Sequence, residues 1–424
     1  MKKTLKAIRG MSDILPQQSS SWTKLEHSIA SVLNLYAYRE IRLPIVEKAD
    51  VFQRSIGDQT DIVQKEMYSF ADKNGDFITL RPEGTAGCVR AALENSLLQQ
   101  IPQRLWYMGP MFRHERPQRG RQRQFHQAGV EFFGSGAPEA DAELILLTRR
   151  LWSELGLRGL RLEINSLGDA DSRKQYKEKL VSYFSRHLDK LDEESVLRLQ
   201  KNPLRILDSK NPSLKNIISS APSLLDSLDE QSQLHFEKFQ NILEKYGINA
   251  VVNPRLVRGL DYYNGTVFEW ITEELGAQGT VCAGGRYDNL VELMGGSAVP
   301  AIGLAMGLER LLELQRLQNP LDAPLAPDLY ICATENDLDD EALKFAELLR
   351  DSYPHLSIQL HTSAGKLKAR LKKADRSGAK VAILIGEDEI KENQVTVKPL
   401  RTRAEQTTCS ISELEEVLGR FLQD

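Results

Sequence analysis

The chain has 424 residues, of which 41% are hydrophobic and 27% charged, and its formal net charge is −4. These values are typical of a globular protein of two or three domains, and they exclude a strongly basic protein that binds nucleic acid through its overall charge. No apolar run reaches the roughly 18 residues that a membrane-spanning helix needs.

The N-terminus and the cysteines indicate the compartment in which the protein works. Met1 to Thr4 is basic, but no apolar stretch follows it, so we predict no secretory signal. The cysteines lie far apart in the sequence, without the paired spacing of zinc ligands. We expect them to be reduced, buried thiols of a cytoplasmic protein: Cys88, Cys282, Cys332 and Cys409.

The first third of the chain predicts a helix followed by strands. Apolar residues between Ser20 and Ala37 recur at helical spacing, and the serines ahead of them are expected to cap the helix. Ile41 to Val46 is predicted to be a strand, and Pro44 indicates an edge strand or one that meets another surface. From Phe77 to Phe133 strands predominate, with a helix at about Thr85 to Leu98.

The remainder predicts an insertion and a second module. From near Asp169 to about Tyr246 the chain is charged, helical and interrupted by prolines, which indicates a helical insertion. Strand patterns return at 256–270 and 280–283, and a long helix starts near Gly307. After the proline-rich stretch 319–327, strands and helices alternate, which predicts a small α/β module of mixed or parallel strands.

The most informative segment is a predicted hairpin with a basic tip. Two strands, residues 105–112 and 125–133, flank the hydrophilic loop 115–124. Alternation along the second strand places four residues on one face, beside Arg113 at the end of the first strand: Phe125, Gln127, Gly129 and Glu131. This row could stack a base, hold a phosphate and pair an ammonium group. A solvated polar face on an exposed sheet is the alternative.

Further segments combine polar side chains with sharp turns. Glu83 and Thr85 fall at a helix start, where simple capping would also explain them. Arg258 lies in a predicted strand between apolar residues, which indicates a polar cleft. The glycine turn at 283–288 permits close approach of a ligand, or only turns the chain. Arg310 is predicted in the first turn of a helix, where anions bind favourably, or is an exposed helix residue.

Together these segments resemble the three signature motifs of class II aminoacyl-tRNA synthetases. Motif 1 is similar to the first helix and the Pro44 strand, motif 2 to the Arg113 hairpin, and motif 3 to residues 303–310. Residues 8–13, 80–85, 125–131, 258–263 and 284–288 resemble the bacterial histidyl-tRNA synthetase family, and the last two separate it from other class II members. Their correct order argues against chance agreement.

The resemblance implies an α+β fold. We expect an antiparallel sheet flanked by helices in a class II catalytic domain, residues 1–325, with a helical insertion at about 170–250. An α/β anticodon-binding domain, residues 326–424, follows. The implied activity is a histidine–tRNA ligase, which activates L-histidine with ATP and transfers histidine to the 3′ end of its tRNA. Mg²⁺ would accompany ATP without a fixed protein site, and the enzyme would be a cytoplasmic homodimer.

The resemblance also implies roles for individual residues. Arg258 and Arg113 are expected to be catalytic. Histidine would be held around its α-ammonium group by Glu83, Thr85, Gln127 and Glu131, and around its imidazole by Tyr262, Tyr263 and Tyr287. Because adjacent strand residues face opposite sides, we expect only Tyr263 of the first tyrosine pair to touch the ligand. ATP would be bound by Arg113, Arg121, Phe125 and Arg310. The tRNA acceptor end would contact Arg116, Arg119 and Arg123.

Two other functions fit parts of the pattern. A histidyl-tRNA-synthetase-like regulatory subunit of histidine biosynthesis lacks the Arg-Gly-Leu-Asp-Tyr-Tyr segment and the anticodon-binding domain, but this chain has residues 258–263 and the C-terminal module. A class II enzyme for threonine, proline or glycine is the second alternative. The twin tyrosines and the lack of a zinc-ligand set argue against it.

Overall fold

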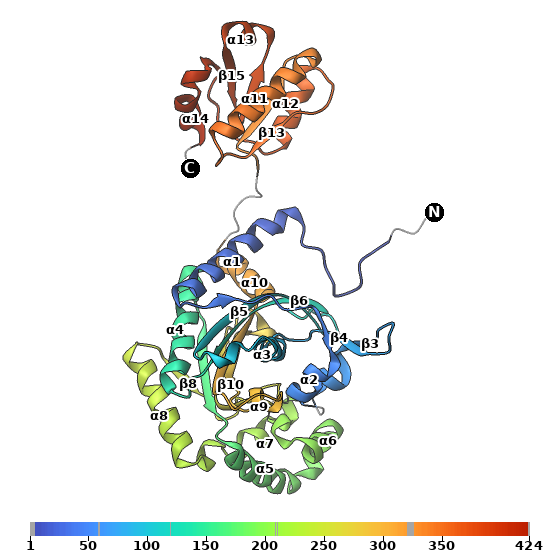
Figure 1. Cartoon of the computed structure of the whole chain (residues 1–424), viewed down its shortest axis with the longest axis vertical. Helices are drawn as coiled ribbons and strands as arrows, with labels where there is room; N and C mark the ends of the chain where they lie inside the picture. Colours follow the sequence, from blue (N-terminus) through green and yellow to red (C-terminus); the bar gives the residue numbers. More distant parts are fainter. Residues whose placement is uncertain are drawn as a thin grey trace. The chain divides into compact units, whose positions relative to one another are not determined.

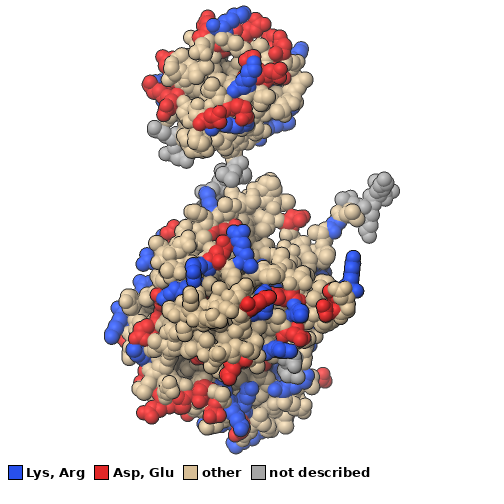
Figure 2. Space-filling view, viewed as in Figure 1, with Lys and Arg blue, Asp and Glu red and all other residues tan. Residues whose placement is uncertain are grey.

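A computed structural model describes residues 5–57, 60–118, 120–207, 209, 211–319 and 326–422. The chain forms two compact units, residues 1–321 and 322–424, each described by itself (Figure 1). Acidic and basic side chains are interspersed over the face shown in Figure 2. No helix in the described part of the chain is long and apolar enough to cross a membrane. All four cysteines are buried free thiols, as predicted.

An eight-stranded sheet forms the centre of the first unit. Its six central strands are antiparallel, as predicted, whereas the outer pairs β1–β5 and β7–β8 are parallel and make the sheet mixed. The strands, in spatial order, are β1 (Arg39–Glu40), β5 (Gln103–Phe112), β6 (Gln124–Phe133), β11 (Ala301–Gly307), β10 (Thr280–Arg286), β9 (Asn264–Ile271), β7 (Arg161–Ser166) and β8 (Ala250–Val252).

The two faces of this sheet pack against different helices. Val130 and Phe132 of β6 share a core with α1 (Pro16–Leu35), α4 (Pro138–Glu154) and α10 (Leu308–Gln318). Phe133 instead packs with Cys88 and Val89 of α3 (Thr85–Glu94). Alternation along β6 therefore directs the row from Phe125 to Glu131 towards the face that α3 covers.

Two predictions near the N-terminus are wrong. Helix α1 begins at Pro16, whose missing N–H costs nothing at the first helical position, so the serines lie inside the helix rather than capping it. Residues 41–45 are not a strand. The Arg81 guanidinium donates to the carbonyls of Leu43 (3.0 Å) and Pro44 (3.4 Å), so side-chain bonds replace a strand ladder here.

The same region forms a small antiparallel sheet. Its strands, in spatial order, are β2 (Val46–Lys48), β4 (Phe77–Leu80) and β3 (Tyr68–Ala71). Helix α2 (Ala49–Ile56) and a π-helical turn, Ile62–Glu66, connect β2 to β3, and a 3-10 turn, Leu97–Gln99, follows α3.

The segment between β7 and β8 is helical, as predicted. It contains α5 (Ala170–Ser185), α6 (Glu193–Lys201), α7 (Lys215–Ser219) and α8 (Glu230–Lys245), with 3-10 turns at Leu188–Lys190, Pro203–Ile206, Pro212–Leu214 and Leu225–Ser227. Asp169, where the composition changes, accepts the Ser172 N–H at 2.7 Å and caps α5. Figure 1 shows α5, α6 and α7 grouped at one end of the unit.

The second unit is a five-stranded sheet with helices. Strands β13 (Ile358–Leu360), β12 (Leu329–Ala333) and β14 (Val381–Ile385) are parallel, and β15 (Gln394–Pro399) and β16 (Thr407–Ser410) continue the sheet antiparallel. The helices are α11 (Asp339–Ser352), α12 (Leu367–Arg376), α13 (Glu387–Glu392) and α14 (Leu414–Leu422). The alternation of strand and helix follows the prediction.

Candidate active site

The predicted hairpin is present and is held by the N-terminal segment. Strands β5 and β6 pair up to Phe112 and Gln124, and the Arg113 N–H extends the ladder to the Arg123 carbonyl at 2.9 Å. The Gly10 carbonyl accepts the N–H groups of both Arg123 (2.7 Å) and Gln124 (3.0 Å). The segment around Gly10 thus fixes the base of the basic loop.

The three predicted ATP-binding arginines gather beside this loop. Arg310, in the first turn of α10, donates to the Gly120 and Thr280 carbonyls and to the Gln278 amide oxygen. Arg121 also donates to Gln278, at 3.3 Å. Burial lowers the pKa of Arg310, and the positive charges of Arg121 and Arg113 lower it further. The structure therefore concentrates positive charge where an anion would relieve the repulsion.

Arg113 and Phe125 lie together at the end of the hairpin strands. The Arg113 Nε donates to the Pro82 carbonyl at 2.9 Å, and its guanidinium lies 5.2 Å from the centre of the Phe125 ring. Glu115 lies within ion-pair distance of both Arg113 (4.0 Å) and Arg121 (3.3 Å). This arrangement offers a planar surface and a cation at one end of the polar row.

At the other end of the row lies a buried carboxylate. Glu131 has no exposed surface, and it accepts hydrogen bonds from the hydroxyls of Thr85 (2.7 Å), Tyr107 (3.0 Å) and Tyr287. Burial raises its pKa to about 8, although these hydroxyls oppose the shift. In the paired strand β11, a Cβ at Gly303 would lie 1.8 Å from a Glu131 oxygen, so only glycine leaves room for the carboxylate.

Tyr107 is a site residue that the sequence did not reveal. It is opposite Gly129 in the β5–β6 ladder, and its ring takes the space beside that glycine, since a Cβ there would lie 2.1 Å from the ring. Gly129 therefore leaves room for the Tyr107 ring rather than for a ligand. The available signal was the pairing register, which brings an aromatic residue opposite a glycine.

Glu83 and Gln127 differ in the partners available to them. The Glu83 carboxylate accepts hydrogen bonds from the backbone N–H groups of Thr85 (2.7 Å) and Ala86 (2.9 Å). Glu83 thus caps the start of α3, which is the alternative to ligand binding that the sequence left open. Burial raises its pKa. The Gln127 amide oxygen is buried and has no hydrogen-bond partner among the described residues. A buried acceptor of this kind needs a partner, so Gln127 points to a ligand.

The segment carrying Arg258 is not a strand. Residues 253–263 are irregular and β9 begins only at Asn264, which corrects the predicted strand. The rings of Tyr262 and Tyr263 are both buried, with centres 4.7 Å apart, because strand alternation does not apply in a turn. The expectation that only one of them reaches the site therefore loses its basis. Tyr262 also lies 5.8 Å from Tyr287.

Arg258 is largely buried and forms an ion pair with Glu269 of β9. Its guanidinium lies 5.6 Å from the centre of the Tyr263 ring. Desolvation is the largest effect and opposes its charge, but Glu269, Tyr263 and Tyr262 together raise the Arg258 pKa. In the described structure, the Arg258 Nε and the Tyr262 hydroxyl are buried without hydrogen-bond partners.

The predicted tRNA contacts at the hairpin tip are not equivalent. Arg116 is exposed, whereas Arg123 is half-buried and donates to the Glu115 carbonyl at 3.2 Å. Arg119 lies outside the described residues. Of these arginines, Arg116 is available for a phosphate, and Arg123 helps to hold the loop.

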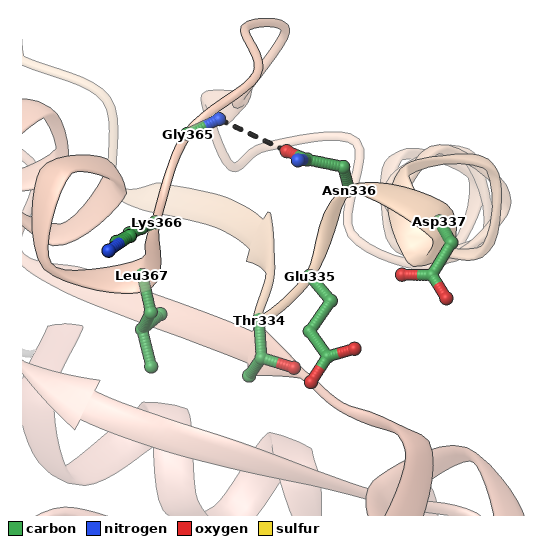
Figure 3. Close-up of a pocket in the computed structure, with 7 residues that line it drawn as sticks. All are labelled: Thr334, Glu335, Asn336, Asp337, Gly365, Lys366 and Leu367. Carbon is green, nitrogen blue, oxygen red and sulfur yellow. Dashed lines mark hydrogen bonds between the residues drawn. The ribbon is translucent and has the colours of Figure 1, made fainter.

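The second unit contains an open polar cleft of about 620 Å³ (Figure 3). Its walls are residues 334–337, after β12, and 365–367, which lead into the first turn of α12. Arg370, which has no exposed surface, joins the walls by donating to Asn336, Asp339 and the carbonyls of Ala333 and Gly365. Glu335, Asp337 and Glu387 form an exposed acidic group there.

The sheet, its motif segments and the charged row define a class II aminoacyl-tRNA synthetase with an anticodon-binding domain. Residues 10–311 match the histidyl-tRNA synthetase family, and residues 328–420 match the anticodon-binding domain family. Because the first match covers more than half of the chain, the protein belongs to the histidyl-tRNA synthetase family.

Solved structures agree with this assignment. Apo histidyl-tRNA synthetase from S. aureus is 35% identical, with a TM-score of 0.81, over 99% of this chain and 100% of that one. A histidyl-tRNA synthetase from Nostoc is 20% identical, with a TM-score of 0.68, over 99% of this chain and 100% of that one. At this low identity the likeness supports the fold alone. The protein is accordingly a histidine–tRNA ligase, with ATP as a substrate.

Proposed function

We propose that the row on β6 and the segment around Arg258 form one site in which histidine reacts with ATP. The observation that supports this most is a set of buried, unpartnered polar atoms in the described structure: the Gln127 amide oxygen, the Arg258 Nε and the Tyr262 hydroxyl. Buried polar groups are normally satisfied, so an acceptor and donors of this kind favour a polar ligand among them.

For histidine, the burial gradient favours a particular orientation. Tyr287 was assigned to the imidazole by resemblance, and its hydroxyl bonds to the fully buried Glu131. We therefore place Glu131 at the imidazole end, rather than at the α-ammonium group. Gln127 is less deeply buried and has a free acceptor for the ammonium group. Thr85 lies between the two ends, and Glu83 contributes negative charge.

For ATP, the cluster of arginines supplies the anion site. Arg121 and Arg310 would hold the triphosphate, Arg113 the α-phosphate, and Phe125 would stack on adenine. Mg²⁺ would be held mainly by phosphate oxygens, with Glu115 and Glu66 beside it. The proximity of Glu115 adds to the effect of burial in raising the Glu66 pKa, so a cation there would relieve their repulsion. Bound Mg²⁺ neutralises charge on the phosphates.

The chemistry requires positioning rather than a protein nucleophile. The histidine carboxylate attacks the α-phosphorus and pyrophosphate leaves, so negative charge accumulates on the α-phosphate oxygens. Arg113 and Arg258 would bind these oxygens, because planar guanidinium groups suit both phosphate and carboxylate. The histidyl group then passes to the terminal ribose of the tRNA, for which exposed Arg116 supplies a phosphate contact.

The test is exchange of labelled pyrophosphate into ATP with each amino acid in turn. Exchange should depend on histidine and Mg²⁺, because a pocket that hydrogen-bonds a polar side chain rejects others by roughly 10⁴-fold. Comparable exchange with threonine or proline would contradict the proposed histidine site. The variants Gln127→Ala and Glu131→Gln should each raise the KM for histidine.

We further propose a cytoplasmic homodimer with domains 1–325 and 326–424. The small sheet β2–β4–β3 and the residue before it support the dimer, because they expose apolar side chains that a twofold interface would cover: Ile45, Val46, Phe70 and Phe77. Light scattering should give twice the mass of the chain at micromolar concentration. Val46→Asp should shift the mass towards that of a monomer, whereas Leu197→Asp, an exposed change on α6, should not.

A further inference from the structure

The irregular segment 255–263, which carries Arg258, is held by the helical insertion on several sides. Arg173 of α5 donates to the Tyr263 carbonyl at 2.6 Å. Arg205, just after α6, donates to the Gly259 carbonyl at 2.7 Å and to the Asp261 carboxylate at 3.1 Å. Asn202 also donates to Asp261, at 3.2 Å.

The attachment is reciprocal. Arg255, at the start of the segment, donates to the carbonyls of Ser219, Pro222 and Ala221 in the insertion. Segment 255–263 belongs to no strand or helix, so no ladder of backbone hydrogen bonds fixes its course. Its conformation therefore depends on individual bonds, most of them from the insertion, with one from the Asn165 amide of β7 to the Leu256 carbonyl at 3.0 Å. The position of the Arg258 backbone thus depends in large part on the insertion.

We infer that the helical insertion is a positioning element for amino-acid activation, in which Arg205 and Arg173 act on the reaction through Arg258. This inference rests on the proposed catalytic role of Arg258. It assigns the insertion a function in the first step, in which tRNA takes no part. Neither arginine touches the reacting atoms, so both are positioning residues.

The burial of Arg173 supports a positioning role for that residue, whereas the bonds from Arg205 and Asn202 lie at the exposed edge of the segment. Arg173 is mostly buried, and burial lowers its pKa while Asp169 and Asp261 oppose that shift. On the opposite side, Asp261 packs against Gly57, where a Cβ would lie 2.7 Å from its carboxylate oxygen, and the Asp261 N–H bonds to the Ile56 carbonyl at 3.1 Å. Asp261 is exposed, but its contacts link the insertion to the catalytic core.

The experiment measures pyrophosphate exchange in the full chain without tRNA. Arg205→Ala and Arg173→Ala should each lower kcat by about 10- to 100-fold, the cost of slight misplacement of a catalytic group, with a much smaller change in the KM for ATP. Arg205→Lys keeps one donor and should recover part of the loss. Unchanged kcat in both alanine variants would overturn the inference.

Two controls separate this role from general loosening of the insertion. Tyr183→Phe removes a hydrogen bond within the insertion, to the Ile217 carbonyl at 2.9 Å, and Arg186→Ala removes an exposed positive charge from the same region. Both should leave activation unchanged. If they lower kcat as much as Arg205→Ala does, the positioning role is wrong.

A double-mutant cycle distinguishes the inference from its premise. If Arg205 acts through Arg258, the double variant Arg205→Ala/Arg258→Ala should be no slower than Arg258→Ala alone. Additive losses would overturn the inference while leaving the role of Arg258 intact. If Arg258→Ala itself retains activation, the proposed function fails instead. If an alanine variant does not fold, Arg173→Lys is combined with Arg258→Ala in the same double-mutant cycle.

Discussion

The Arg258 guanidinium is ion-paired with the Glu269 carboxylate of the neighbouring strand, and Glu269 also accepts the Thr280 hydroxyl at 3.0 Å. A charge held in this way is pre-organised, since it need not be reoriented during the reaction. The pair also leaves the Arg258 Nε free of protein partners among the described residues.

We expect Arg258→Ala to lower the turnover of histidine activation by about 10²–10³-fold, because a fixed donor stabilises the charge that develops in the transition state. Arg258→Lys should not restore the rate, because lysine lacks the planar fork. Single-turnover measurements should show a much smaller deficit in transfer from preformed adenylate. Activation that stays near the wild-type rate would make Arg258 a structural residue.

Glu131 should make both stability and histidine binding depend on pH. Its pKa lies at about 8 in the folded protein against an ordinary value of 4.5, so the folded state binds more protons between these values. Stability contributed by the protonated carboxyl is therefore lost as pH rises through this window. Relative to Glu131→Gln, the wild type should become less stable with rising pH, by an amount that chemical denaturation can measure.

Histidine binding should change in the opposite direction. The ionised carboxylate binds an imidazole N–H more strongly than the protonated form does, so the KM for histidine should fall as pH approaches about 8. The groups facing Glu131 are Thr85, Glu83, Cys88, Tyr107, Tyr262, Tyr263 and Tyr287. Glu131→Gln should remove this dependence, and an identical pH profile in the variant would refute the assignment.

The two sides of the basic loop should affect different steps. Arg116→Ala should weaken charging more than activation, because the exposed side chain is available to tRNA. Arg121→Ala should weaken activation, because Arg121 lies in the cluster with Arg310. Charging by the wild type should fall steeply as the salt concentration rises. The dependence of charging on salt should be shallower for Arg116→Ala. If Arg116→Ala weakened both steps equally, Arg116 would serve ATP binding rather than tRNA binding.

Arg370→Met should impair the function of the second unit without affecting histidine activation by the first. Removing the guanidinium leaves the Ala333 and Gly365 carbonyls without their donor, which costs roughly 1–3 kcal/mol per buried group. The second unit should unfold at a lower temperature, and charging should weaken while pyrophosphate exchange stays normal. The exposed neighbour Lys372→Met is the matched control. Loss of exchange in Arg370→Met would show that the unit also serves activation.

Much of the fold could be predicted because its elements are strongly periodic. The hairpin, the insertion helices and the alternating C-terminal module follow from spacing and proline placement. The errors lie where side chains replace regular backbone bonding. Arg81 bonds the chain at Leu43 and Pro44, and the insertion bonds the segment around Arg258, so neither is a strand. No periodicity carries that information.

The site was predicted in part for the same reason. Alternation along β6 put Gln127 and Glu131 on one face, but the sequence could not show that Tyr107 fills the space beside Gly129. That fact depends on the register between two strands. Likewise, the resemblance implied a tRNA contact for Arg123, and only the folded loop shows that its guanidinium donates to the Glu115 carbonyl.

The bonds from Arg123 and Gln124 to the Gly10 carbonyl have a practical consequence. They attach the segment around Gly10 to the loop that carries the proposed nucleotide site, although more than a hundred positions separate the two in sequence. A protein shortened to begin after Met11 would keep every strand of the large sheet and still lose the support of its ATP loop. An affinity tag for purification is therefore better fused to the C-terminus, because an N-terminal fusion that disturbs Gly10 would remove the bonds that hold this loop.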